Sequence, residues 1–141
     1  MKVEFVVPGE PQGKGRPRFA RVGRYTKTYT PEKTEVYENL IKVEYERQCG
    51  RFCFEPNQML DMRIIAYFGI PKSVSKKRRE QMLNGQIRPT KRPDADNVCK
   101  LVADGCNKLV YPDDAQIVDI MIRKFYSDKP RVKVIIQSVE K

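Results

Sequence analysis

The clearest pattern in the chain is an alternation over residues 60–68, in which every second residue is apolar. A period of two is typical of a β-strand with one buried face. Shorter apolar segments predict further strands at residues 2–7, 116–126 and 131–139. Because only residues 127–130 separate the last two strands, we expect those two strands to pair as a hairpin.

Helical signals mark two main helices and a shorter basic one. Thr30 is a candidate N-cap with a proline and an acid behind it, and Gly50 is a typical helix end, so the first helix is expected to run to about Gln48. The second main helix is predicted over residues 96–109 and the basic helix over residues 73–84. The expected buried stripes are Val36, Leu40 and Val43, with Tyr37 and Ile41 beside them, in the first helix, and Val98, Leu101, Val102 and Leu109 in the second.

Together these elements predict an α+β (mixed α/β) fold. We expect a mixed, largely antiparallel sheet that is packed by the two main helices. At 141 residues the chain has the length of one domain, so residues 1–141 are assigned to a single unit. Residues 14–30 are expected to form a basic arm, in which residues 19–30 make a β-hairpin that turns at Gly23.

The charge balance of the chain is strongly basic. It has 28 Lys and Arg against 18 Asp and Glu, a formal net charge of +10, which suits contact with nucleic-acid phosphates. No apolar run is long enough to span a membrane and the N-terminus does not resemble a signal peptide, so we expect a cytoplasmic location. The chain contains no histidine, which excludes Ser-His-Asp and Cys-His catalysis. The spacing of its four cysteines matches neither a disulfide framework nor a zinc finger, and we expect reduced thiols.

An acidic cluster stands within this basic chain. Asp94 and Asp96 precede the second main helix, and Asp114 follows Asp113 just before the next strand. Phosphate binding alone does not explain acids at such a place. A divalent metal does, because Mg²⁺ binds a few carboxylates together with phosphate oxygens. The joint interpretation of the acids and the basic surroundings is a metal-dependent nuclease.

Simpler interpretations of the same residues stay open. Asp-x-Asp before a helix is often a cap, and Pro-Asp-Asp is common in turns. Lys100 lies one helical turn after Asp96, so it either forms an ordinary salt bridge with Asp96 or stabilises the charge that develops on a phosphate. Asp104, a further turn along, is expected to be a surface acid or an indirect support of the site rather than a ligand.

Two basic tracts flank the acids. Residues 14–27 hold six basic residues and no acid, and residues 72–92 hold eight basic residues and one acid. The first tract lacks the glycine spacing of a P-loop, so no nucleotide cofactor is expected; aromatic residues among its charges offer base stacking, and a solvated loop is the alternative. Both tracts are predicted to contact a DNA backbone by shape rather than by base sequence. The candidate DNA-binding residues are Lys14, Arg16, Arg18, Arg21, Arg24, Lys76, Lys77, Arg78, Lys91 and Arg92.

Two longer motifs carry a family resemblance. The first is Lys91-Arg92-Pro93-Asp94-Ala95-Asp96-Asn97-Val98-x-Lys100, and the second is Tyr111-x-Asp113-Asp114-Ala115-Gln116-Ile117-Val118-Asp119. In both, and in Gly13-Lys14-Gly15-Arg16-Pro17-Arg18-Phe19 and Tyr29-Thr30-Pro31, the chain resembles the RusA family of Holliday junction resolvases over nearly its whole length. Val98 departs from the family pattern, in which Leu is usual at that position.

This resemblance implies an activity and its residues. It implies a homodimeric, Mg²⁺-dependent endodeoxyribonuclease, encoded by bacteria or their prophages, which resolves four-way DNA junctions by paired symmetric nicks in recombination and repair. It places catalysis on Asp94, Asp96, Asp114 and Lys100, and metal binding on Asp94, Asp96, Asp114 and Asp113. One or two Mg²⁺ ions are expected, for which Mn²⁺ can substitute. A two-fold dimer would bring two sites to symmetry-related strands of the junction.

Other functions remain compatible with the residues alone. A non-catalytic DNA-binding protein would bind DNA in a salt-sensitive way without nicking it. A nuclease could act on other branched DNA or on RNA. A Mg²⁺-dependent glycosyltransferase could use Asp-Ala-Asp, although the chain is short for such an enzyme and its basic excess would then have no explanation.

Overall fold

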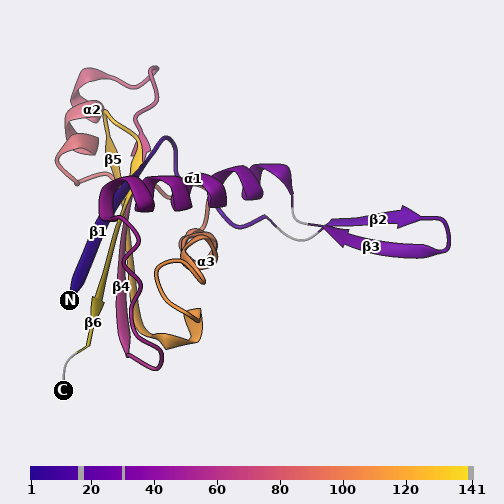
Figure 1. Cartoon of the computed structure of the whole chain (residues 1–141). Helices are drawn as coiled ribbons and strands as arrows, with labels where there is room; N and C mark the ends of the chain where they lie inside the picture. The colour runs from indigo at the N-terminus through magenta and orange to yellow at the C-terminus, as the bar shows by residue number, and fades with distance from the viewer. Residues whose placement is uncertain (16–17, 30, 140–141) are drawn as a thin grey trace.

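The structure is a computed structural model that describes residues 1–15, 18–29 and 31–139. Four strands form one sheet in the order β1-β6-β4-β5, in which β5 runs parallel to β4 and the other neighbours are antiparallel. This arrangement confirms the predicted α+β fold with a mixed, largely antiparallel sheet. The elements follow one another as β1 (Lys2–Pro8), β2 (Arg18–Val22), β3 (Tyr25–Tyr29), α1 (Glu32–Cys49), β4 (Leu60–Gly69), α2 (Lys76–Leu83), α3 (Ala95–Cys106), a 3₁₀ turn (Asp114–Gln116), β5 (Ile117–Ser127) and β6 (Arg131–Ser138) (Figure 1).

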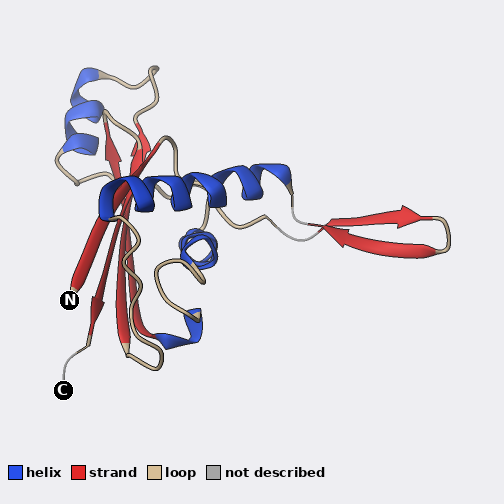
Figure 2. Ribbon diagram, viewed as in Figure 1, coloured by secondary structure: helices blue, strands red, loops and turns tan. Residues whose placement is uncertain are grey.

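The core lies between one face of the sheet and the helices α1 and α3 (Figure 2). Side chains alternate between the two faces of a strand, so every second residue of β4 from Leu60 to Phe68 is buried, as predicted. The two helices approach each other closely at Gly105, where a Cβ atom would come within 2.7 Å of the Ile41 side chain. Glycine at this position therefore permits the close packing of the C-terminal part of α3 on α1.

The buried face of α1 agrees only in part with the predicted stripe. Tyr37, Ile41 and Tyr45 are buried, whereas Val36 and Val43 are 61% and 60% exposed. Residues spaced by four share one face of a helix, and the two valines lie about half a turn away from that face. The apolar ring of a tyrosine suits a core position. The Tyr45 hydroxyl donates to a backbone carbonyl at 2.6 Å, whereas the Tyr37 hydroxyl is buried without a hydrogen-bond partner among the described residues.

Strands β5 and β6 do not pair with each other, so the predicted hairpin was wrong. β4 lies between them, parallel to β5 and antiparallel to β6. Strands on either side of a third are about 10 Å apart. Residues 127–130 can cross this gap, because an extended chain covers about 3.3–3.6 Å per residue. The short link between the strands thus showed that their ends are close, and it did not show that they are neighbours.

The ends of α2 and α3 also differ from the predicted ranges. α2 begins only at Lys76, because Ser75 is its N-cap and accepts a hydrogen bond from the Arg78 N–H at 3.2 Å. α3 ends at Cys106, three residues before the predicted end, and Lys108 beyond it has a φ of 66°. A left-handed residue cannot continue a right-handed helix. The predicted N-cap of the first helix, Thr30, lies outside the described residues.

β2 and β3 form the predicted hairpin, which turns at Gly23 with a φ of 59°. Figure 1 shows this hairpin extending away from the sheet and the helices. Its apolar side chains stay in solvent: Phe19, Val22 and Tyr25 are 72%, 58% and 80% exposed. We call residues 18–29 the hairpin arm. Among the described residues, no helix is both long and apolar enough to cross a membrane.

Candidate active site

A loop between β1 and the hairpin arm crosses the N-terminal end of α3. The Lys14 N–H donates to the Asn97 carbonyl at 2.9 Å, and the Gly15 N–H donates to the Thr34 hydroxyl at 3.0 Å. At Gly13 a Cβ atom would lie 2.9 Å from the Pro93 ring, so glycine permits the close contact. Between this loop and α3 lies a groove of about 630 Å³, lined by Pro11, Gln12, Gly13, Lys14, Arg92, Pro93, Asp94 and Asn97.

Asp94 and Asp96 lie at the start of α3. Asp94 is the N-cap residue and has an extended backbone, yet its side chain accepts no capping hydrogen bond. The simpler interpretation, that the Asp94 side chain serves to cap the helix by a hydrogen bond, is therefore wrong. Asp96 lies within the first helical turn, because α3 begins at Ala95, one residue earlier than predicted. Both carboxylates are exposed at the positive end of the helix dipole, where a negative charge is stabilised.

Asp113 and Asp114 begin the 3₁₀ turn after α3. The Asp113 carboxylate accepts a hydrogen bond from the Ala115 N–H at 2.9 Å, and its own N–H donates to the Gln116 side chain at 3.2 Å. The simpler interpretation, turn capping, therefore holds for Asp113, and its metal role stays a prediction. The Asp114 N–H donates to the Asn107 side chain at 3.2 Å, which ties the turn to the end of α3.

Asp114 has unfavourable electrostatic surroundings within the acidic cluster, which comprises Asp94, Asp96, Asp113 and Asp114. Its partial burial, the negative charge of Asp104 and its contact with Asp113 all raise the pKa of the Asp114 carboxyl. Each of these causes disfavours the ionised form. A cation placed beside Asp114 would reverse the effect, since an opposite charge favours the carboxylate.

Asp104 links the acidic cluster to the loop and to α1. Its carboxylate and that of Glu38 each lie 2.9 Å from the ammonium of Lys14. Burial acts to lower the pKa of Lys14, but the hydrogen bonds to the two acids outweigh it and raise that pKa. Lys14 is thus held by the protein's own acids, and its contact with DNA stays a prediction. This three-residue network could not be predicted from the sequence, because its members come from three separate segments.

Lys100 is exposed on α3, one helical turn after Asp96 and one before Asp104. Within the described part of the chain, no carboxylate lies within salt-bridge distance of its ammonium. The ordinary salt bridge with Asp96, the simpler interpretation, is therefore not formed. The charge of Lys100 is left available for a group from outside the protein.

Lys124 supplies a positive charge near Asp94 that the sequence did not reveal. Its ammonium donates to the Lys91 carbonyl at 2.7 Å, which fixes it beside the segment that leads into α3. Burial lowers the pKa of Lys124, and the charge of Asp94 acts in the opposite direction. One signal was present in the sequence: Lys124 follows Ile122 at a spacing of two along β5 and shares its face of the strand, where a lysine is uncommon because Ile122 packs against the core.

The carboxylates fit Mg²⁺ in the chemistry of their donor atoms. Mg²⁺ prefers hard oxygen ligands, and it often binds one or two carboxylates while phosphates and water complete its shell. Within residues 1–15, 18–29 and 31–139, no three His, Cys, Asp or Glu side chains gather closely enough to hold one ion by themselves. A bound ion would therefore share its ligands between these acids and a phosphate, and it would relieve the crowding at Asp114.

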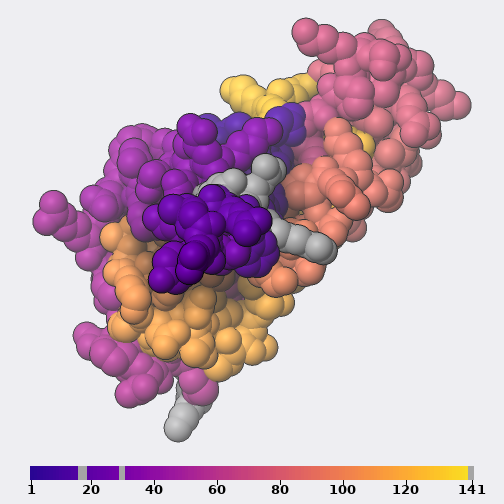
Figure 3. All heavy atoms as spheres, turned by 90° about the vertical axis from the view of Figure 1, so that its right-hand side faces the viewer, coloured from indigo at the N-terminus to yellow at the C-terminus, as the bar shows by residue number. Residues whose placement is uncertain are grey.

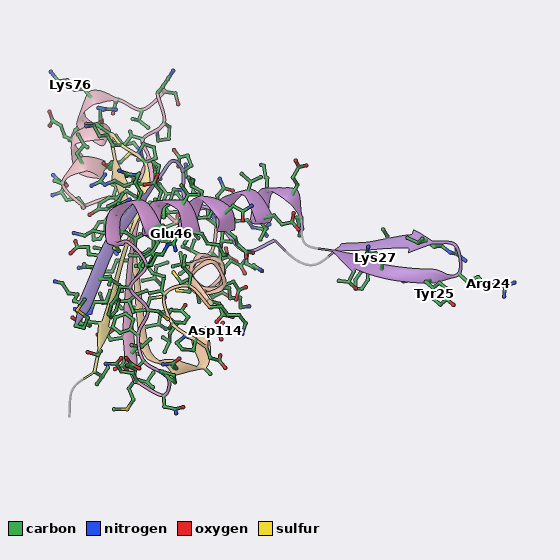
Figure 4. The ribbon with its side chains drawn as sticks, viewed as in Figure 1. Arg24, Tyr25, Lys27, Glu46, Lys76 and Asp114 are labelled. Carbon is green, nitrogen blue, oxygen red and sulfur yellow. The ribbon has the colours of Figure 1, made fainter. Side chains whose placement is uncertain are left out.

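The hairpin arm carries one group of predicted DNA contacts. Arg21 and Arg24 are exposed on it, and Figure 4 shows Arg24 and Tyr25 at its tip. Asp114 lies on the side of the body from which the arm extends (Figure 4). Arg16 lies outside the described residues, and of Arg18 only the backbone is described.

The second basic tract lies around α2. Figure 4 shows Lys76 at the far end of α2, away from the hairpin arm. Viewed along the arm, however, the segments near residues 70–100 and 110 lie beside and below it on one face (Figure 3). The tract therefore borders the same face as the acidic cluster. Its predicted DNA contacts, all exposed, are Lys76, Lys77, Arg78, Lys91 and Arg92.

Comparison with known proteins agrees with the motifs. The family model described as Endodeoxyribonuclease RusA matches residues 8–137, which include the whole acidic cluster. The chain is 36% identical over 139 residues to YqaN of Bacillus subtilis (strain 168), an uncharacterised protein. The aligned region covers 97% of this chain and 96% of YqaN. It is 32% identical over 100 residues to a protein of Lactococcus phage r1t named crossover junction endodeoxyribonuclease rusA, with 70% of each chain covered. These matches confirm the resemblance to the family.

Proposed function

The chain belongs to the RusA family of endodeoxyribonucleases, and on this premise we propose that it resolves four-way DNA junctions by paired, Mg²⁺-dependent nicks. The observation that carries this proposal is the position of Asp114, an acid crowded by other acids beside α3 in a chain of net charge +10. A surface that binds only phosphate gains nothing from such a cluster. A surface that binds phosphate together with a divalent cation requires one.

We assign the ion to the carboxylates of Asp94, Asp96 and Asp114, with Asp113 as a neighbouring acid. Mg²⁺ or Mn²⁺, as one ion or two, would supply Lewis-acid stabilisation of phosphate oxygens and activation of water. Lys100 has no carboxylate partner among the described residues, so its ammonium can bind the scissile phosphate and offset the charge that develops in the transition state. Lys124 and Lys14 act indirectly, because each is held within the protein.

DNA binding is assigned to the hairpin arm and to the basic tract around α2. Arg21 and Arg24 on the arm can pair with backbone phosphates, and the exposed ring of Tyr25 offers a surface for an unstacked base at a branch point. Two nicks placed symmetrically require two active sites, so the proposal includes a homodimer. It also includes a role in recombination and repair in the cytoplasm of a bacterial cell, in line with the bacterial and phage relatives.

The test is a nicking assay on a synthetic four-way junction, with Mg²⁺ or with EDTA, beside a linear duplex. We expect paired symmetric nicks on the junction with Mg²⁺ only. Asp94→Asn and Asp114→Asn should each lose nicking by at least about 100-fold and retain junction binding. Glu46→Gln is a matched acid-to-amide control, because Glu46 is exposed on α1, away from Asp114 (Figure 4).

The outcomes separate the proposal from its alternatives. Junction binding without cutting under any divalent metal would favour a non-catalytic DNA-binding protein. Nicks that fall on flaps, forks or RNA in preference to four-way junctions would keep the nuclease and change its substrate. Normal nicking by Asp94→Asn or Asp114→Asn would refute the assignment of the acids.

A further inference from the structure

One face of the main sheet is covered by helices and the other is open. α1 and α3 pack on the face that carries the buried alternate residues of β4 (Figure 2). The intervening residues of β4, such as Ile65 and Tyr67, point to the opposite face and remain partly exposed. We call this second side of the sheet the open face. Basic residues lie along it, and their partners differ between its two ends.

Toward the beginning of β4 and across to β1, the basic residues of the open face are paired with acids. The Arg63 side chain lies 3.3 Å from the Asp61 carboxylate. The Lys133 ammonium lies 2.7 Å from the Glu4 carboxylate. These pairs compensate their own charges, so this part of the open face offers little attraction to a charged partner.

Where β4 and β5 end, arginines of the open face are held by aromatic rings instead. Tyr67 and Phe125 are neighbours across the two strands, with ring centroids 6.3 Å apart. The Arg131 guanidinium lies 3.9 Å from the centre of the Tyr67 ring. Those of Arg88 and Arg123 lie 4.3 Å and 4.9 Å from the centre of the Phe125 ring. We call these five residues the arginine–aromatic cluster. Among the residues that the structure describes, none of its arginines forms a salt bridge with a carboxylate.

This arrangement prepares the guanidiniums to bind an anion. A ring contacts the flat face of a guanidinium, whereas the N–H bonds lie in its plane and stay free. The protein uses only part of these donors: Arg88 donates to the Lys124 carbonyl at 2.9 Å, and Arg131 donates to the Lys129 carbonyl at 2.8 Å. Each arginine has five N–H donors, so several remain. A phosphate fits them, because a guanidinium binds it through two parallel hydrogen bonds and its negative charge relieves the repulsion among the three cations.

A short segment between α2 and α3 joins this cluster to the acidic cluster around the edge of the sheet. Lys124 and Phe125 are adjacent in β5, so their side chains point to opposite faces. The segment is bound on both sides of the strand: Arg88 stacks on Phe125, and the Lys91 carbonyl accepts from the Lys124 ammonium at 2.7 Å. Asp94 follows Arg88 by six residues. At about 3.6 Å per residue, six residues span at most about 22 Å, so one DNA molecule can reach both clusters.

We propose that the arginine–aromatic cluster is a second site for the DNA backbone, which holds phosphates of a junction arm that extends from the acidic cluster past β5 onto the open face. The choice of DNA as the polyanion rests on the proposed function. Arg123 and Arg131 lie outside both basic tracts, so the site adds a surface to those already assigned. It reads no base, because guanidiniums occupy the faces of its two rings.

The salt dependence of junction binding tests the site in EDTA, without metal or cutting. Each phosphate contact adds about 0.9 to the slope of the logarithm of the binding constant against the logarithm of the salt concentration. Arg123→Gln should therefore lower this slope by about 1. The combined change of Arg88, Arg123 and Arg131 to Gln should lower it by about 2 to 3 and weaken binding at least about tenfold.

Arg63→Gln is the matched control for this measurement. It removes the same charge from the same face, since Arg63 lies opposite Met121, two residues from Arg123 along the neighbouring strand. Arg63 is paired with Asp61, so the slope should stay nearly unchanged. An unchanged slope in the triple variant, or an equal decrease for Arg63→Gln and Arg123→Gln, would overturn the proposal.

Photo-cross-linking locates the DNA independently of charge. Met121 is 41% exposed and lies on the same side of β5 as Arg123. When p-benzoylphenylalanine replaces Met121, we expect a cross-link to a labelled four-way junction in EDTA. The same group in place of Lys2, which is exposed on β1 at the far edge of the sheet, is the control and should give none.

The outcomes of cross-linking separate this proposal from others. Cross-linking to DNA that is no stronger at residue 121 than at residue 2 would overturn it. A cross-link from residue 121 to protein in place of DNA would also overturn it and assign the open face to a protein partner. A chain that binds and cross-links the junction as expected, but does not nick it with any divalent metal, would refute the proposed function and support the second DNA site.

Discussion

Asp114 and Asp94 belong to one acidic cluster but have opposite surroundings. Burial, Asp104 and Asp113 all raise the pKa of the Asp114 carboxyl. Asp94 is exposed and has the positive charge of Lys124 nearby. The protein thus compensates one end of the cluster with a lysine of its own and leaves the other end uncompensated. This difference indicates that Asp114 is the position where an external cation changes the energy most.

The largest effect on nicking should come from removing the charge of Lys100, which has no salt-bridge partner among the described residues. Lys100→Met is expected to lower the nicking rate by about 100-fold, because it removes a preorganised charge that acts on the phosphate. Junction binding should change little, since many other basic residues contribute to it. Lys2→Met is a control for the loss of one positive charge, because Lys2 is exposed on β1 at the far edge of the sheet. An equal loss in both variants would show that Lys100 acts only through overall charge.

A smaller effect is expected at the compensated end. Lys124→Met keeps the packing of the side chain but removes the charge near Asp94 and the bond to the Lys91 carbonyl. We expect nicking to fall about tenfold, in line with other losses of a supporting contact. Lys133→Met is the control, because Lys133 is paired with Glu4 on the distant β1–β6 pair. Unchanged nicking by Lys124→Met would show that Asp94 needs no compensation from the protein.

Two variants should shift the pKa of Asp114, at the uncompensated end, in opposite directions. The pH profile of nicking would report both shifts. Asp104→Asn removes a charge that raises the pKa of Asp114, so that pKa falls and the acid limb of the profile moves to lower pH. Lys14→Met leaves the charge of Asp104 in place without its cation, so the limb should move to higher pH. Asp128→Asn, which affects an exposed acid paired with Arg79 on α2, should leave the limb in place. Shifts of the same sign for both variants would show that Asp104 acts through structure and not through charge.

The sequence predicted what depends on neighbouring residues. The alternation along β4 and the turn at Gly23 follow from the local sequence, and the structure confirms them. The buried stripe of α3 is confirmed at Val98, Leu101 and Val102, whereas Leu109 lies beyond the end of the helix. The stripe of α1 was predicted only in part: Tyr37 and Ile41 are buried as expected, but Tyr45 lies in the core and Val36 and Val43 lie in solvent. Local apolar character alone does not decide which face of a helix is buried.

What the sequence could not predict depends on contacts between distant segments. The place of β5 beside β4 instead of β6 is decided by competition among three strands for the centre of the sheet. The network of Lys14, Glu38 and Asp104 joins residues from a loop and two helices. The motif with Asp94, Asp96 and Lys100 indicated the family correctly. The raised pKa of Asp114 could not be predicted from the sequence, because it depends in part on the position of Asp104 in space.

The smallest expected effect is on folding stability. Asp114→Asn and Asp94→Asn should change it in opposite directions. A carboxyl whose pKa is raised in the folded state favours folding at low pH, and that contribution is lost as the pH rises through the folded pKa. At about pH 7, Asp114→Asn should therefore stabilise the fold, by about 0.5 kcal/mol or less. Asp94→Asn removes a charge that attracts Lys124, so it should destabilise the fold by a similar amount.

Urea unfolding at two pH values can resolve these opposite changes, provided that the slope of the free energy against urea is the same for all variants. At about pH 3, below the usual pKa of Asp, the gain from Asp114→Asn should disappear, because the carboxyl is already neutral there. Glu46→Gln should change stability little at either pH, since Glu46 is exposed and forms no salt bridge among the described residues. If Asp114→Asn were less stable than the unaltered chain at neutral pH, the carboxyl would be favourably placed in the free protein, and the need for a cation at Asp114 would lose its physical basis.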